Sequence, residues 1–302
     1  MQQEIKKQII EFVQQKPRTI QEIAELIKKN WRTADRYVEE IEKEDGSIAT
    51  RTFRPGSRGA LKLVYYQNTE KIASNEFQER ITQKILTGRK KEDFSPLDIF
   101  QYVPQEKRHA FLETQHDEFA VLEQDMRGLL NKAEEQVLIF SGNLSWATAQ
   151  QQKEEIIMSL AQTAQRGIPI KIISRIDIAT LNNYQKIQQV NEILQKNKIE
   201  VRYVEQPLRA IIIDDKIVRL KEIKQPQNYK RGELKKTTYI FYDISDLEWV
   251  EYLKRVFWRL FSTAPTAEKR KEILDEIEDI TLIKKVKESE LGHVARAHQS
   301  AL

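Results

Sequence analysis

The first 45 residues carry apolar side chains at the spacing of three helices. One helix is predicted over residues 4–13, and Pro17 stops it. A second begins at Thr19, because Glu22 three residues later completes a capping box. A third is predicted over about residues 31–44. The inward faces are formed by Ile5, Ile9, Phe12 and Val13, by Ile20, Ile23, Ala24 and Ile27, and by Ala34, Tyr37, Val38 and Ile41.

Two strands are predicted after the third helix. Gly46 ends that helix, because glycine readily adopts the left-handed conformation of a C-cap. Residues 47–53 and 60–66 are rich in strand formers, and a Pro-Gly pair lies in the segment 54–59 between them, which is typical of a hairpin. The order helix, helix, turn, helix, hairpin predicts a winged helix-turn-helix domain over residues 1–68.

Residues 69–118 show a helical but less regular pattern. Ser95 and Pro96 begin a short second helix within this stretch. His109 and His116 lie seven residues apart, so on a helix they would share a face. No zinc-type carboxylate–histidine motif accompanies them. The stretch is predicted to be a helical connector, whose first helix carries Ile72, Phe77, Ile81 and Ile85.

Strands and helices alternate in residues 119–262. The segments 137–140, 168–174 and 200–204 are almost continuously apolar, which is typical of a parallel sheet covered on both faces. The sequence therefore predicts a C-terminal α/β domain. Helices are expected over residues 119–135 and over about 180–196, and a further helix between them ends at residue 167.

An antiparallel part completes this domain. A hairpin is expected around the polar turn at residues 214–216, and a strand follows at 237–242. Ser245 then caps an apolar helix that carries Trp249. Residues 263–302 are predicted to form a charged amphipathic helix and a frayed tail.

Composition narrows the class of function. The 302 residues are 40% hydrophobic and 32% charged, which is typical of a helix-rich protein of two domains. The absence of cysteine excludes disulfides, thiolate zinc sites and cysteine nucleophiles, and favours a cytoplasmic, nucleoid-associated location. No apolar run approaches the roughly eighteen residues of a membrane span, and no secretory signal is recognised, so no membrane partner is expected. The net charge of +4 alone does not establish a nucleic-acid partner.

The charges of the first domain are arranged for double-stranded DNA. The major groove admits one α-helix, which a protein positions by binding phosphates on either side. Arginines occupy the start of the third helix while its glutamates gather at the far end, and the hairpin has basic but no acidic residues. A solvated helical module or a protein-binding one would carry similar charges, and Trp31 would serve equally well in packing. We expect base contacts from Trp31, Arg32, Thr33, Asp35 and Arg36, and phosphate contacts from Arg18, Lys28, Lys29, Arg51, Arg54, Arg58 and Lys62.

Several segments resemble a known family. Residues 30–38 look like the recognition helix of many archaeal winged-helix regulators. Later segments resemble the effector domain of the TrmB family of archaeal transcriptional regulators, which is a single phospholipase-D-like half. The resemblance implies a DNA-binding regulator that forms a homodimer, because phospholipase D folds pair two halves and this chain has one. The segments concerned are residues 136–142, 166–173, 200–203, 209–215 and 249–261.

The catalytic motif of phospholipase D enzymes is absent. That motif is His-x-Lys-x4-Asp, and Arg209, Ile211 and Lys216 stand at its three positions. Arginine stays protonated and cannot act as a nucleophile or base. Isoleucine cannot bind a phosphate. The resemblance therefore implies a domain that is not an enzyme.

The sequence gives weaker support for other chemical sites. Asp214 and Asp215 are adjacent, but a hairpin turn favours these residues, so no metal is expected. The turn after the first apolar strand could offer backbone N–H groups to an anion, although a plain turn has the same sequence. An unknown small-molecule effector would bind at the strand ends, at Ser141, Asn143, Ser174, Arg175 and Arg209.

The sequence as a whole favours a sequence-specific transcriptional regulator of double-stranded DNA with no cofactor. A non-catalytic phospholipase-D-like domain would serve dimerisation or effector sensing. Two alternatives remain. One is a phosphodiesterase or nuclease with a non-standard active site, and the other is a DNA-associated structural protein or adaptor without regulatory ligand.

Overall fold

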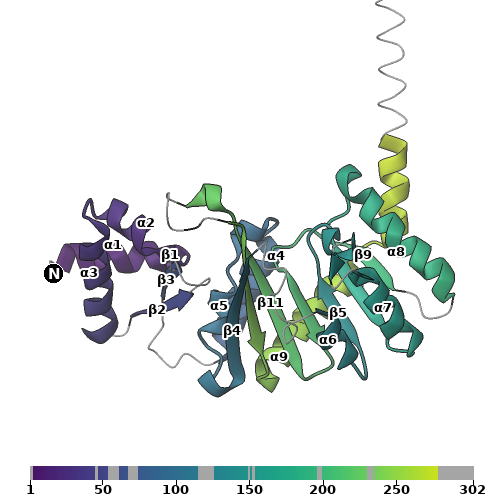
Figure 1. The fold of residues 1–302 in the computed structure, drawn as a ribbon, viewed down its shortest axis with the longest axis horizontal. Helices are drawn as coiled ribbons and strands as arrows, with labels where there is room; N and C mark the ends of the chain where they lie inside the picture. The colour runs from purple at the N-terminus through teal and green to yellow at the C-terminus, as the bar shows by residue number, and fades with distance from the viewer. Residues whose placement is uncertain are drawn as a thin grey trace, which may run out of the picture.

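The computed structural model of the chain describes residues 3–44, 47–53, 61–66, 74–114, 126–148, 150–151, 154–195, 199–229, 234 and 236–277. In these residues helices and strands are mixed, and two sheets dominate (Figure 1). No helix within these ranges is long and apolar enough to cross a membrane.

The N-terminal residues form three helices beside a three-stranded antiparallel sheet. The capping box predicted for the second helix is present: the Thr19 side chain accepts the N–H of Glu22, whose carboxylate accepts the N–H of Thr19. The inward faces predicted for the helices meet in one core. The elements are α1 (Gln3–Gln15), β1 (Arg18–Thr19), α2 (Ile20–Leu26), α3 (Trp31–Glu44), β2 (Ile48–Phe53) and β3 (Leu61–Tyr66), with β3 in the centre of the sheet.

A seven-stranded mixed sheet lies at the centre of the rest of the molecule, in the order β4-β12-β11-β10-β5-β8-β9. The parallel sheet predicted from the apolar strands is confirmed for β5, β8 and β9, and the predicted hairpin is β10 with β11. The strands are β4 (Arg108–Thr114), β5 (Val137–Phe140), β8 (Ile170–Ser174), β9 (Glu200–Tyr203), β10 (Ala210–Ile213), β11 (Ile217–Lys224) and β12 (Thr238–Ile244).

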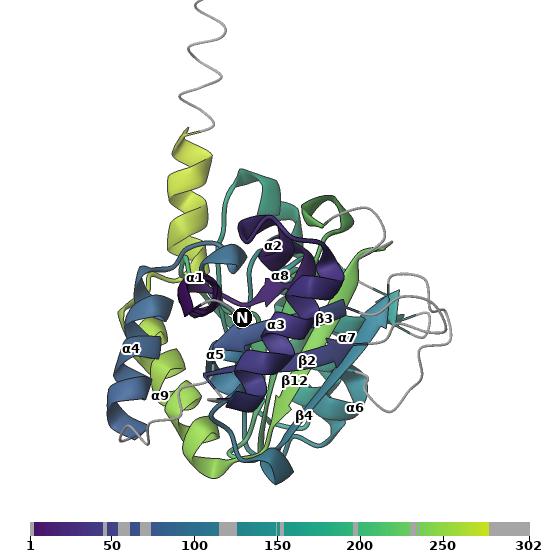
Figure 2. The same ribbon diagram turned by 90° about the vertical axis from the view of Figure 1, so that its left-hand side faces the viewer.

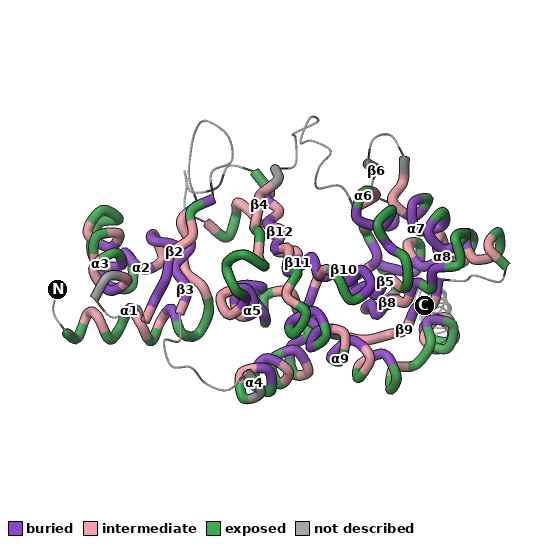
Figure 3. The backbone as a smooth tube through the Cα atoms, turned by 90° about the horizontal axis from the view of Figure 1, so that it is seen from below, coloured by how far each residue is buried: buried purple, intermediate pink, exposed green. Residues whose placement is uncertain are grey.

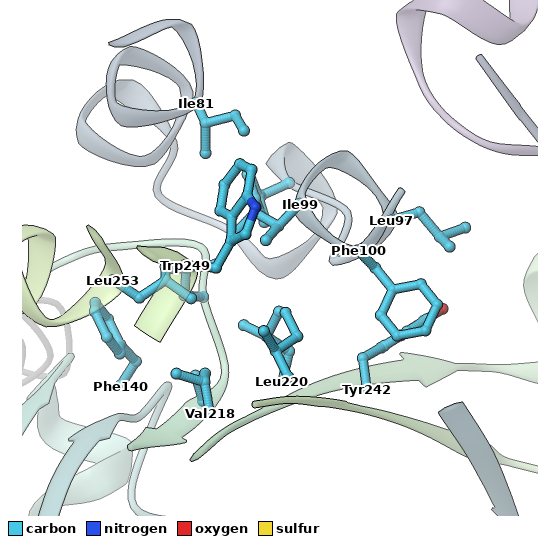
Figure 4. Packing of buried hydrophobic residues seen from close by; sticks show 14 of the residues in the cluster. Ile81, Leu97, Ile99, Phe100, Phe140, Val218, Leu220, Tyr242, Trp249 and Leu253 are labelled. Atoms are coloured by element: carbon cyan, nitrogen blue, oxygen red, sulfur yellow. The ribbon is translucent and has the colours of Figure 1, made fainter. Parts of the chain in front are cut away.

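Helices cover both faces of this sheet, each over its own core. Ile81, Phe100 and Trp249 are among the residues of one core, which Figure 4 shows between the helices and the strands. The opposite core contains Leu160, Ile187 and residues of β5 and β8. The first face carries α4 (Ser74–Thr87), α5 (Leu97–Phe100) and α9 (Leu247–Thr263), and the second carries α6 (Met126–Asn131), α7 (Ile156–Gln165), α8 (Leu181–Leu194) and the helical residues 267–277.

Three expectations from the sequence are corrected. Residues 108–114, predicted as part of a helical connector, form the edge strand β4, because all seven pair with β12. The helix predicted over 119–135 is, in the described part, only α6, which ends at Asn131. Asp246 rather than Ser245 caps α9, since its carboxylate accepts the N–H of Trp249.

The small N-terminal sheet packs against the large core with its second face. Ala49, Phe53, Leu61, Leu63 and Tyr65 belong to the same buried cluster as Phe100 and Tyr242. The ring of Phe53 meets that of Tyr242 edge to face, with centroids 6.5 Å apart. Residues of β2 and β3 thus pack on one face against the helices and on the other against the large domain, as the buried stretches of both strands in Figure 3 show.

Candidate nucleic-acid interface

Helix α3 has one buried and one open face. Ala34, Val38 and Ile41 are fully buried in the N-terminal core. Arg32 and Arg36 are exposed, and half of the Trp31 side chain is open to solvent. The helix begins where predicted because the Asn30 side chain accepts the N–H of Thr33. Figure 2 shows α3 across the end of the molecule, in front of the sheets.

The turn before α3 is basic and open. Lys28 and Lys29 are both exposed, and Lys28 has a positive φ of 52°, which the tight turn between α2 and α3 requires. The N–H groups of both lysines donate to carbonyls of α2. The two lysines therefore lie in the turn that directly precedes α3.

Asp35 and Lys62 form an ion pair with each other. The Nζ of Lys62 lies 2.6 Å from a carboxylate oxygen of Asp35 and 3.2 Å from one of Glu39. Although burial opposes the charge, these carboxylates raise the pKa of Lys62. The pair thus joins β3 to α3, and Asp35 and Lys62 neutralise one another.

Two further arginines of the predicted set point into the protein. The guanidinium of Arg18 lies 3.7 Å above the Phe12 ring and forms an ion pair with Glu22. Arg51 is on the face of β2 that packs against the large domain, where it donates to the Ala110 carbonyl and lies over the Phe100 ring. Burial lowers the pKa of Arg51. Arg54 and Arg58 lie outside the described residues.

The five residues predicted for an effector pocket divide into two groups. Ser141, Asn143 and Arg209 line one cavity of about 390 Å³ beside the ends of β5 and β10. Ser174 is completely buried, and Arg175 pairs with Asp177; neither lines that cavity. The Ser141 hydroxyl accepts the N–H of Leu144 and the indole N–H of Trp146, so it organises the turn after β5.

Arg209 is held against the backbone of Gly142. Its Nη1 donates to the carbonyls of Leu208 (2.7 Å) and Gln206 (3.3 Å). A Cβ on Gly142 would lie 2.3 Å from Nη2 of Arg209, so a larger residue at this position would require the guanidinium to move.

Asp214 has a structural role. Its buried carboxylate accepts the backbone N–H groups of Glu134, Glu135 and Gln136, at 2.8–3.2 Å. Burial opposes ionisation, but these N–H groups hold the pKa of Asp214 below its usual value. Asp215 pairs with Lys254. In the described part of the chain no three His, Asp or Glu residues gather into a group that could hold a metal ion.

Comparison with known proteins gives structural likeness alone. No protein-family model and no curated protein matches the sequence. Nuc of Salmonella typhimurium, a phospholipase D family member, is similar over 53% of this chain and 97% of its own, at 13% identity and a TM-score of 0.39. The archaeal chromatin protein TrmBL2 is similar over 87% of this chain and 94% of its own, at 15% identity and a TM-score of 0.38. NucT from Helicobacter pylori is similar over 53% of this chain and 99% of its own, at 19% identity and a TM-score of 0.38. Likeness this distant assigns no function to the chain.

Proposed function

We propose that residues 1–68 form a winged helix-turn-helix that binds double-stranded DNA, with α3 in the major groove. The observation that carries this proposal is the open face of α3, where Arg32 and Arg36 project from the half of the helix next to Lys28 and Lys29. A helix of this kind fits the groove, its arginines can pair with guanine, and the lysines are placed for phosphates.

The proposed contacts are narrower than those predicted from the sequence. Arg18 and Arg51 are held by partners within the protein, and Lys62 is paired with Asp35 and Glu39, so these cations are left out. Arg54 and Arg58 remain candidates for phosphate contacts, as predicted from the sequence. The bases would be contacted by Arg32, Thr33 and Arg36, with Trp31 at the edge of the surface.

A titration of fluorescent duplex DNA at several salt concentrations tests this surface. Lys28→Ala and Lys29→Ala should each reduce the slope of log affinity against log salt by about one, because each removes one phosphate contact. Lys7→Ala is the matched control: Lys7 is an exposed helical lysine that pairs with Glu11 and belongs to α1 rather than to α3 or the turn before it. An unchanged slope in both test variants would refute the assignment of the turn.

We further propose that the chain is a transcriptional regulator that acts as a homodimer and not as an enzyme. A two-fold dimer would present two copies of α3 to two half-sites. Light scattering tests this: a dimer mass at micromolar concentration is expected, and a monomer would contradict it. Arg209, Ile211 and Lys216 offer no nucleophile of the phospholipase D kind, so DNA and phosphodiester substrates should stay intact with or without divalent metal. Metal-dependent turnover by the wild type would instead establish a nuclease.

A further inference from the structure

The cavity beside β5, β10 and β11 combines aromatic walls with positive charge. The rings of Trp146, Tyr239 and Phe241 contribute to its lining, and its volume of about 390 Å³ is within the range of small-molecule sites. Among the described residues its lining includes Arg209, Arg219 and Lys221 but no aspartate or glutamate.

The two arginines of this lining differ in their partners. Arg219 forms a two-pronged ion pair with Asp243, with both N–O distances at 2.7 Å. No carboxylate of the described residues lies within ion-pair distance of Arg209, whose hydrogen bonds go to the carbonyls of Leu208 and Gln206. Holding a half-buried guanidinium without a counter-charge is costly unless an anion joins it.

Neighbouring positive charges increase the cost of holding the Arg209 guanidinium without a counter-charge. Arg175, directly after β8, donates its backbone N–H to the Gly142 carbonyl, so its backbone lies beside the turn on which the Arg209 guanidinium rests. Lys221 is directly opposite Arg209 in the antiparallel pair of β10 and β11, since its N–H donates to the Arg209 carbonyl at 2.7 Å. Burial and the charge of Arg175 lower the pKa of Arg209 to about 10, although Glu92 opposes this. The surroundings of Arg209 therefore favour an incoming anion.

We propose that this cavity binds a small organic phosphate with a planar ring, of the size of a nucleoside monophosphate. The phosphate would lie on the guanidinium of Arg209, with Lys221 contributing charge, and the ring would lie among Trp146, Tyr239 and Phe241. A guanidinium offers a phosphate monoester paired hydrogen-bond donors. This site is separate from α3 and does not depend on the proposed function.

Calorimetry with adenosine 5′-monophosphate as the probe tests the site. We expect saturable one-to-one binding to the full chain, at least tenfold tighter than that of adenosine, which lacks the charge, or of inorganic phosphate, which lacks the ring. Arg209→Met should weaken binding at least tenfold. Arg166→Met is the matched control, because Arg166 also donates to two backbone carbonyls but lies away from the cavity, and it should bind the probe as the wild type does.

Thermal melting distinguishes a ligand-binding arginine from a structural one. Without the probe, Arg209→Met should melt at or above the wild-type temperature, because it removes a cation that lacks a counter-charge. Arg219→Met should melt several degrees lower, because it leaves the carboxylate of Asp243 without its ion-pair partner. Failure of the probe to bind at millimolar concentration, equal binding of adenosine, or undiminished binding by Arg209→Met would each overturn the proposal. Arg36→Ala should bind the probe normally, so failure here and failure of DNA binding are distinguishable.

Discussion

Arg36 and Arg51 have the same side chain but opposite surroundings. Arg36 projects from the open face of α3, where its only close carboxylate among the described residues is Glu40, one turn on. Arg51 is half-buried between β2 and the large domain and donates to the Ala110 carbonyl. Sequence composition cannot separate the two, because the partner of Arg51 lies 59 residues away. Arg36 is therefore available for contact with DNA, whereas Arg51 takes part in packing.

Arg51→Ala should therefore lower stability rather than alter DNA recognition. We expect a loss of about 1–3 kcal/mol in the free energy of unfolding, because a partly buried hydrogen bond and contacts with aromatic rings are removed. Urea denaturation measures the loss, and the salt dependence of DNA binding by the folded variant should match the wild type. A reduced salt slope with unchanged stability would show that Arg51 contacts phosphate.

Asp214→Asn should destabilise the protein by about 2 kcal/mol at pH 7, because an amide cannot accept all of the N–H groups that the carboxylate accepts. The folded pKa of Asp214 is lowered, so its contribution is complete above the unfolded value and is lost as pH falls through the folded value. The difference between variant and wild type should therefore shrink on acidification below about pH 4. Asp215→Asn, at an exposed position of the same turn, is the control; equal losses in both would contradict this role.

At the scale of elements, the sequence predicted what local rules determine. The capping box at Thr19, the start of α3 and the three parallel strands follow from spacing and apolar pattern, and all are present. Strand β4 was missed because its pairing partner, β12, lies about 130 residues further along the chain. The signal that was available is the apolar pair Phe111 and Leu112, but short apolar runs fit helix and strand alike.

The packing of the small sheet was also unpredictable from local pattern. Residues of β2 and β3 enter two different cores, so the strands do not show a simple alternation of apolar and polar residues. Among the predicted site residues, this packing removes Arg51 from the surface, and the Asp35–Lys62 pair arises from contact between β3 and α3. Tertiary contact thus reassigns charges that the sequence alone placed at the DNA.

Phe53→Ala tests this packing. We expect a loss of about 3 kcal/mol or more in the free energy of unfolding, because the substitution leaves a cavity against Tyr242 in the large core. Thr52→Ala is the control, since Thr52 is exposed on the other face of the same strand and should change stability by less than about 0.5 kcal/mol. Equal urea midpoints for the two variants would show that the small sheet does not depend on this contact.

At the scale of the whole molecule, α3 lies at the end opposite α7 and α8 (Figure 1). The small sheet fixes this arrangement by burying one face under the helices and the other against the large domain. The open face of α3 thereby points away from the large domain. The large domain would then position the DNA-binding surface, while the cavity at Arg209 offers a separate site for a ligand.

Selection of bound sequences from a random pool of duplex DNA tests the central claim most directly. We predict that the wild type enriches a defined sequence, and that Arg36→Ala binds this sequence roughly ten- to a hundredfold more weakly, the cost of one paired contact to a base. Lys7→Ala should retain wild-type affinity. No enrichment by the wild type, or the same affinity for the selected sequence in Arg36→Ala, would contradict the placement of α3 in the major groove.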